Sequence, residues 1–195
     1  MHFFKKINVI TIIIIIIIII ISILLVIMYK TPQSEENKII IKNIVVEDKE
    51  DLKFLSFDQE ININYLISEA IDKGIPLVFK VTLEIVEVND IWPTKTVLKK
   101  IRYYQIEYKA LRKVYKIKDI NGKNYEYKYL DEAIQKISKV KDFGFSFNNN
   151  QVNFELWLNV ALERKKLPKP LQVNYFDRTW YMNSNKSIYK FGKLN

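Results

Sequence analysis

The stretch 77-LVFKVTLEIV-86 decides the fold of this chain. Every second position in it is apolar: Leu77, Phe79, Val81, Leu83 and Ile85. A period of two places these side chains on one face of a strand, against a core. The stretch 152–162, VNFELWLNVAL, repeats the pattern without a break. We therefore expect two long strands, each with one buried face.

Two other segments show the helical period. Apolar residues recur at intervals of three and four within 63–71 and again within 130–137. Asn62 or Asn64 can cap the first segment, and Gly74 with Pro76 ends it. Both segments are predicted to be amphipathic helices.

Shorter runs predict the remaining strands: 39–46, 52–57, 96–117 with a turn near 110–113, 125–129, 143–147, 172–176 and 179–182. Asn121-Gly122 predicts a tight hairpin turn. Asn148–Asn150 predicts a second hairpin, which would pair 143–147 with 152–162. Together these elements predict an α+β fold, a mainly antiparallel β domain with two covering helices on the concave face of a curved meander. A β-sandwich with the helices at its ends is the alternative.

The N-terminal part has a different character. Ile7 to Met28 carries no charge and includes an unbroken isoleucine run, Ile12 to Ile21. A helix of this length spans about 33 Å, against a hydrocarbon core of about 30 Å. The run exceeds the apolar core of a cleaved signal peptide, and Met28-Tyr29-Lys30-Thr31 offers no small-residue cleavage site. We expect an uncleaved transmembrane helix that anchors the chain in a lipid bilayer.

The predicted organisation follows from this anchor. Residues 1–6 form a short basic tail, 7–28 the transmembrane segment, 29–37 a polar linker, 38–185 the β-rich domain and 186–195 a C-terminal tail. A short basic tail before a long apolar segment is typical of a signal-anchor with a cytoplasmic N-terminus. We therefore expect a single-pass protein of the inner membrane, whose C-terminal domain faces the periplasm.

The composition argues against several kinds of chemistry. The chain has no cysteine, and its one histidine is His2, outside the predicted domain. A catalytic triad with histidine, a histidine metal cluster and a disulfide framework are therefore excluded from that domain. The net charge is +9, but lysines are scattered among acidic residues and arginine is rare, so no nucleic-acid-binding surface is expected. We predict no enzymatic activity and no cofactor.

Five motifs occur in a fixed order: GIPLVF at 74–79, YKAL at 108–111, LDEA at 130–133, LPKPL at 167–171 and WYMNS at 180–184. In order and spacing they resemble the proteobacterial family catalogued as domain of unknown function number 4390. The resemblance implies a secreted or membrane-anchored envelope protein without assigned activity, encoded near a membrane sensor kinase of the nitrogen-sensing type. The chain departs from the family after the GIPL strand, where Val86–Trp92 keeps one tryptophan and no arginine, and it lacks a second tryptophan after Ser184.

The candidate interaction residues are Trp92, Tyr104, Tyr108, Tyr115, Pro168, Pro170 and Trp180. Tyrosines gather in neighbouring strands and suit an interface, although cross-strand packing explains them as well. The two prolines predict an extended segment that serves either as a crossover or as a docking site. The function expected is a non-catalytic interaction or signalling accessory module with a membrane or periplasmic protein partner, such as the sensor kinase that the resemblance implies. Binding of a lipid or another apolar small ligand is the alternative.

Overall fold

The computed structural model describes residues 14–22, 38–49, 52–88, 94–147, 153–172 and 180–191. The chain divides into two compact units, Met1–Glu35 and Glu36–Asn195. In the first unit, residues 14–22 are helical, and the rest of the predicted span 7–28 lies outside the described residues. Across the ranges given above, no helix combines the length and the apolar character needed to cross a membrane.

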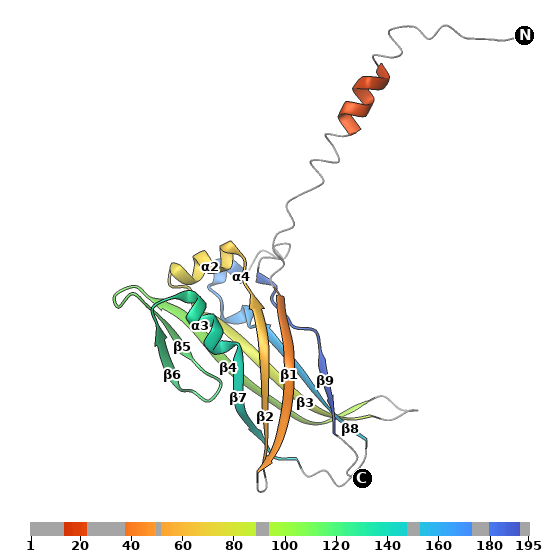
Figure 1. Ribbon diagram of the computed structural model, residues 1–195, viewed down its shortest axis with the longest axis vertical. Helices are drawn as coiled ribbons and strands as arrows, with labels where there is room; N and C mark the ends of the chain where they lie inside the picture. The colour runs from red at the N-terminus through yellow and green to blue at the C-terminus, as the bar shows by residue number, and fades with distance from the viewer. Residues whose placement is uncertain are drawn as a thin grey trace, which may run out of the picture. The chain divides into compact units, whose positions relative to one another are not determined.

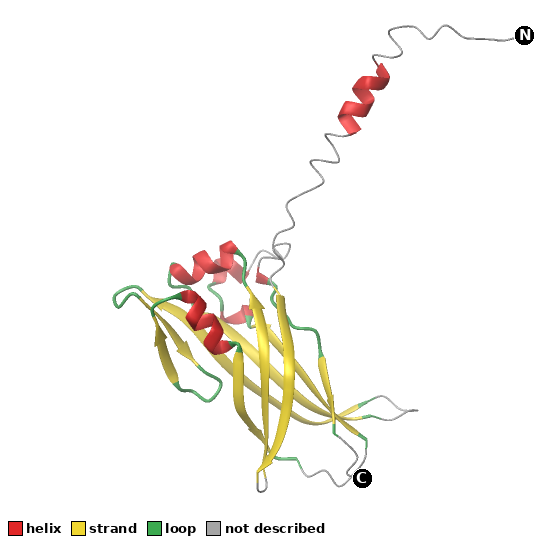
Figure 2. Cartoon of the chain, viewed as in Figure 1, coloured by secondary structure: helices red, strands yellow, loops and turns green. Residues whose placement is uncertain are grey.

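The second unit contains two antiparallel sheets (Figure 2). The larger sheet has the strand order β6-β5-β4-β3-β8-β9, with bounds Asn124–Tyr127, Val114–Lys118, Lys95–Lys109, Leu77–Glu87, Phe154–Leu162 and Ser187–Lys190. The smaller sheet has the order β1-β2-β7, with bounds Lys38–Lys49, Leu52–Asn62 and Lys139–Phe145. The α+β class and the antiparallel pairing are thus confirmed, but the strands form two sheets and not one meander. The alternative with two sheets is the closer description.

One apolar core joins the two sheets. The five alternating residues of β3, from Leu77 to Ile85, are each 0% exposed, as their spacing predicts. The inward residues of β8 are buried beside them. From the smaller sheet, Leu55, Phe57 and Phe143 complete the same cluster. Burial of these faces on both sheets supplies the main stabilisation of the domain.

Two helices lie at one end of the sheets, as Figure 1 shows. They are α2 (Tyr65–Asp72) and α3 (Leu130–Ile137). Asn64 caps α2, since its Oδ1 accepts the Ile67 N–H at 2.9 Å. Gly74 ends this helical segment with a φ of +82°, a conformation that residues with a side chain rarely adopt. Both predicted helices and the predicted end at Gly74 are confirmed.

Several local predictions are wrong. Strand β7 pairs with β2, while β8 pairs with β3 and β9, so the two strands lie in different sheets and do not form a hairpin with each other. The physical reason is burial: the nine residue pairs between β8 and β3 place the alternating apolar residues of both strands side by side on one buried face. The prediction followed chain proximity and missed this long-range pairing.

The C-terminal part also differs from the sequence-based expectation. The LPKPL segment is not extended: after η1 (Arg164–Lys166) it turns into the short helix α4 (Lys169–Gln172). Pro170 fits there because the first turn of a helix requires no N–H donor from it. The predicted strand 172–176 lies almost entirely outside the described residues, and residues 180–182 are not a strand. Ser187–Lys190, assigned from the sequence to a tail, form β9.

Candidate functional site

The larger sheet has one face that neither helix covers. In the pairing register, Thr82 lies opposite Ile101 and Asn159, and Lys80 lies opposite Tyr103 and Ala161. Directly opposed residues share a face, and this face is opposite to the buried row of β3. We call it the outer face and define it by these residues: Lys80, Thr82, Glu84, Lys99, Ile101, Tyr103, Trp157, Asn159, Ala161 and Ile188.

Large apolar side chains are exposed on the outer face. Ile101 is 42% exposed, Tyr103 45% and Ile188 47%. Trp157 lies between Glu84 and Ile188 in the register, and the Lys186 ammonium sits 3.3 Å from the centroid of its ring. Exposed aromatic and aliphatic groups with cations beside them are typical of protein interfaces.

An open groove runs along the outer face over β3 and β8. It has a volume of about 480 Å³, and its floor includes Thr82, Asn159 and Ala161. At its border the Arg164 guanidinium lies 4.1 Å from the centroid of the Tyr181 ring. The Nε atom of Arg164 is buried and has no hydrogen-bond partner among the described residues. A guanidinium over an aromatic ring, with no carboxylate partner among the described residues, is arranged to receive one.

Segment 180–184 borders this groove and joins the two sheets. Ser184 is 2% exposed, its hydroxyl oxygen accepts the Val160 N–H at 2.9 Å, and its own N–H donates to the Val160 carbonyl at 2.7 Å. Ser184 also forms a β-bridge with Ile39 of β1. The segment therefore connects β8 of the larger sheet to β1 of the smaller one.

The family model described as "Domain of unknown function (DUF4390)" matches residues 36–189. The chain belongs to this family. No curated protein and no solved structure matches the chain. The match covers both sheets of the folded unit, including all but the last residue of β9, so the DUF4390 domain and this folded unit coincide closely.

The predicted tyrosines of this DUF4390 domain lie on the inner face of the sheet. Tyr104 is 2% exposed and stacks on Phe79, with 4.9 Å between ring centroids. Tyr108 and Tyr115 are half-buried and pair across β4 and β5 at 5.0 Å. Tyr104 is part of the core, whereas Tyr108 and Tyr115 pack against it and keep part of their surface exposed. Tyr103, which alternation sends to the other side, is the exposed one.

The other predicted residues lie in different parts of the structure. Trp180 is 7% exposed and belongs to the core, whereas its neighbour Tyr181 is 45% exposed. Pro168 and Pro170 are exposed around α4. Trp92 lies outside the described residues. The structure thus does not bring the predicted set together. Of the predicted residues that it describes, only Trp180 lines the groove, and the residues that define the outer face were not selected from the sequence.

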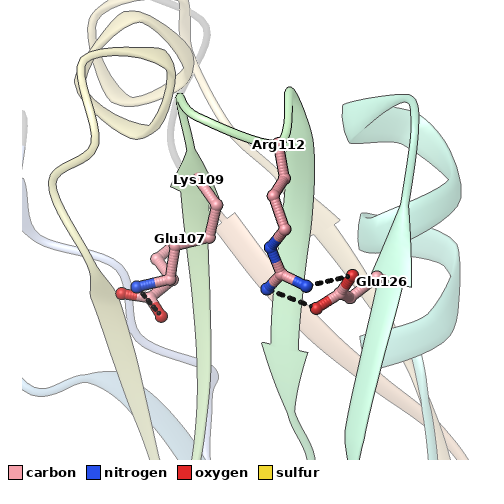
Figure 3. Close-up of polar contacts among 4 residues, drawn as sticks. All are labelled: Glu107, Lys109, Arg112 and Glu126. Carbon is pink, nitrogen blue, oxygen red and sulfur yellow. Dashed lines mark hydrogen bonds and ion pairs between the residues drawn. The ribbon is translucent and has the colours of Figure 1, made fainter.

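Ion pairs neutralise the outer side of the β4–β6 end. Figure 3 shows Lys109 beside Glu107 at 2.8 Å, and Arg112 bound to both carboxylate oxygens of Glu126 at 2.6 and 2.9 Å. The second pair fixes the β4–β5 turn to β6 with two parallel bonds. Because their charges are matched locally, these groups add little net field to the outer face. Arg164 and Lys186 have no such acidic partner in the described part of the chain.

A buried polar contact links the two sheets and was not predicted. Gln59 interrupts the inward apolar row of β2 and is 3% exposed. Its amide nitrogen donates to the Tyr104 hydroxyl at 2.9 Å and to the Ile137 carbonyl at 2.7 Å. A glutamine between apolar inward positions is the one sequence signal that marks this contact.

No metal-binding cluster of three or more His, Cys, Asp or Glu side chains is present within the described residues.

Tyr115 provides a pH-dependent test of how α2 attaches to the sheet. Its hydroxyl donates to Asp72 Oδ1 at 2.6 Å, and burial followed by this bond raises the pKa of Tyr115 to about 12. A raised pKa in the folded state means that the contribution is complete below pH 10 and is lost as the pH rises toward 12. We expect Tyr115→Phe to be less stable than the wild type at pH 8, by about 0.5–1 kcal/mol because the site is largely solvated.

Urea titrations at pH 8 and at pH 12 measure this difference. The gap between wild type and Tyr115→Phe should shrink at the higher pH. A gap that stays constant over this range contradicts the role assigned to the Tyr115–Asp72 bond. Tyr129→Phe, at an exposed tyrosine, is the matched control.

Proposed function

We propose that this protein is a non-catalytic interaction module, tethered to a membrane by residues 7–28, that binds a protein partner through the outer face. The observation that carries the proposal is the groove with Arg164 stacked on Tyr181 at its border. Arginine, tyrosine and tryptophan are the residue types that dominate binding energy at protein interfaces.

The charges of the outer face indicate the chemistry of the partner. Lys80 pairs with Glu163 at 3.3 Å, and Lys99 pairs with Glu84 at 2.6 Å. Arg164 and Lys186 remain without acidic partners among the described residues. A partner that presents carboxylates to these two cations, and an apolar group to Ile101 and Tyr103, matches the surface best.

The tether supports a partner in the same membrane. Residues 14–22 are helical, and Ser22, the polar residue at their end, donates its hydroxyl to the Ile19 carbonyl at 2.8 Å. A polar group satisfied within the helix is what a lipid environment requires. The short basic tail before the span supports a cytoplasmic N-terminus and a periplasmic domain at the inner membrane. A membrane sensor kinase, implied by the family resemblance, is the partner class to test first.

Introduction of a charge into the apolar part of the outer face tests the proposal. Ile101→Lys introduces a charge on the outer face, whereas Val45→Lys introduces the same charge at a comparably exposed β-branched residue of β1, 48% against 42% exposed. We expect crosslinking in native membranes to recover the same partner with wild type and Val45→Lys, and at least tenfold less of it with Ile101→Lys. Recovery at an equal level from both variants contradicts the proposal. So does failure to recover any partner above an anchor-only control.

A further inference from the structure

A second concave site lies on the inner side of the domain, between α3, the β5–β6 hairpin and β7. Its volume is about 330 Å³, at the lower end of the range for small-molecule sites. None of its lining residues belongs to the outer face. The sheets themselves are packed with side chains, so this cavity is a recess beside the core and not a hollow within it.

The walls of this cavity combine apolar and polar side chains. They include Ile117, Ile137 and Val140, each at most 5% exposed, together with the half-buried Ile120 and Tyr125. Tyr104 also lines the cavity, and its hydroxyl already accepts a hydrogen bond from Gln59. Burial raises the pKa of Tyr104 well above its ordinary value, so the phenol stays neutral and does not repel an anion.

Cations line the cavity in excess over acids. Four lysines contribute to it, Lys123, Lys136, Lys139 and Lys141, against the two acids Asp119 and Asp142. The Asp119 carboxylate is engaged by the backbone N–H groups of Asn121 and Lys123 at 2.9 and 2.8 Å. Within the described residues, none of the four amines forms an ion pair, and Lys136 instead lies 4.0 Å from the centroid of the Tyr125 ring. The cavity therefore combines apolar side chains with ammonium groups that no acid among the described residues neutralises.

We propose that this cavity binds an amphiphilic carboxylate, with its apolar body against Ile120 and Tyr125 and its carboxylate among Lys136, Lys139 and Lys141. Each part of such a ligand meets the matching part of the site. The apolar body covers the half-buried Ile120 and Tyr125, and the carboxylate satisfies ammonium groups that lack an acidic partner among the described residues. A neutral apolar molecule leaves the lysines unmatched, and a small inorganic anion leaves the walls uncovered.

The test uses the full chain in phosphatidylcholine nanodiscs and a decanoic acid that carries a diazirine in its chain. After illumination, peptide mass spectrometry locates the label. We expect labelling within residues 104–142. Unlabelled decanoate should compete with the probe, and decanol should compete at least tenfold less effectively. The double variant Lys139→Gln/Lys141→Gln changes two exposed lysines, so it should fold and lose at least fivefold of the labelling. Lys38→Gln/Lys95→Gln, at two exposed lysines that do not line the cavity, is the matched control and should label as the wild type does.

Three results overturn the proposal. The label lies outside residues 104–142, or decanol competes as well as decanoate, or the two double variants label equally. Addition of phosphatidylglycerol to the nanodiscs distinguishes a free acid from a lipid headgroup: displacement of the probe by this anionic lipid also overturns the assignment to a free carboxylate. Crosslinking of the Ile101→Lys variant to a protein partner is measured separately. Failure of the cavity proposal therefore leaves the proposed function standing, and the reverse also holds.

Discussion

Trp180→Ala is expected to destabilise the domain by about 3–5 kcal/mol, the range for a large aromatic truncation in a core. Trp180 is 7% exposed and belongs to the cluster that joins both sheets. It also begins the segment that ends at Ser184, which bonds to Val160 of β8 and bridges to Ile39 of β1. A cavity at this position therefore weakens the connection between the sheets as well as the local packing. Domains of this size are stable by about 5–15 kcal/mol, so the loss is a large fraction of the total.

Tyr181→Ala is the matched control for this prediction. The neighbouring ring is 45% exposed and contacts Arg164, a contact worth about 0.5–1 kcal/mol at an exposed site. Urea denaturation followed by circular dichroism should separate the two variants by several kcal/mol. Equal stabilities, or a Trp180→Ala variant as stable as the wild type, contradict the assignment of Trp180 to the core. The sequence suggested an interaction role for this residue, so the same experiment decides between packing and surface.

Two charges in the apolar run are expected to release the protein from membranes. Ile17→Lys/Ile18→Lys places two ammonium groups near the middle of residues 7–28, and each costs about 2.5–3.5 kcal/mol at the centre of a transmembrane helix. Ile17→Leu/Ile18→Leu keeps the segment apolar and is the control. After carbonate extraction, wild type and the leucine variant should remain with the membrane, and the lysine variant should be in the supernatant.

The same preparations test the orientation of the domain. The chain has no cysteine, so a single Thr94→Cys substitution at an exposed position gives one labelling site. A membrane-impermeant maleimide should label it in cells whose outer membrane alone is permeabilised. Wild-type protein recovered in the soluble fraction with its first thirty residues intact contradicts the tether, and labelling only after lysis contradicts the periplasmic side.

Much of the local structure follows from the sequence because local rules suffice for it. Alternation in 77–86 predicted the buried row from Leu77 to Ile85, since a strand has a period of two. Val86 is buried as well, next to a shift in the β3–β4 register that alternation does not predict. Helices α2 and α3 were predictable from the three- and four-residue spacing of their apolar residues. Asn64 and Gly74 also marked the two ends of α2. The β4–β5 turn and the Asn121-Gly122 hairpin were likewise predictable, since Gly122 adopts a φ of +84°.

Long-range pairing is what only the tertiary structure decided. The turn-forming residues Asn148–Asn150 suggested a hairpin. Instead, β8 pairs with β3 and β7 pairs with β2, so β7 and β8 lie in different sheets. That division turned one face of the larger sheet toward the core and left the other uncovered by the helices, so Tyr104 became a core residue while Tyr103 became exposed. The period of two indicates that neighbouring residues in a strand point to opposite faces of the sheet. Which side meets the core depends on partners that are distant in the sequence, and so the binding surface could not be located before the sheets were assembled.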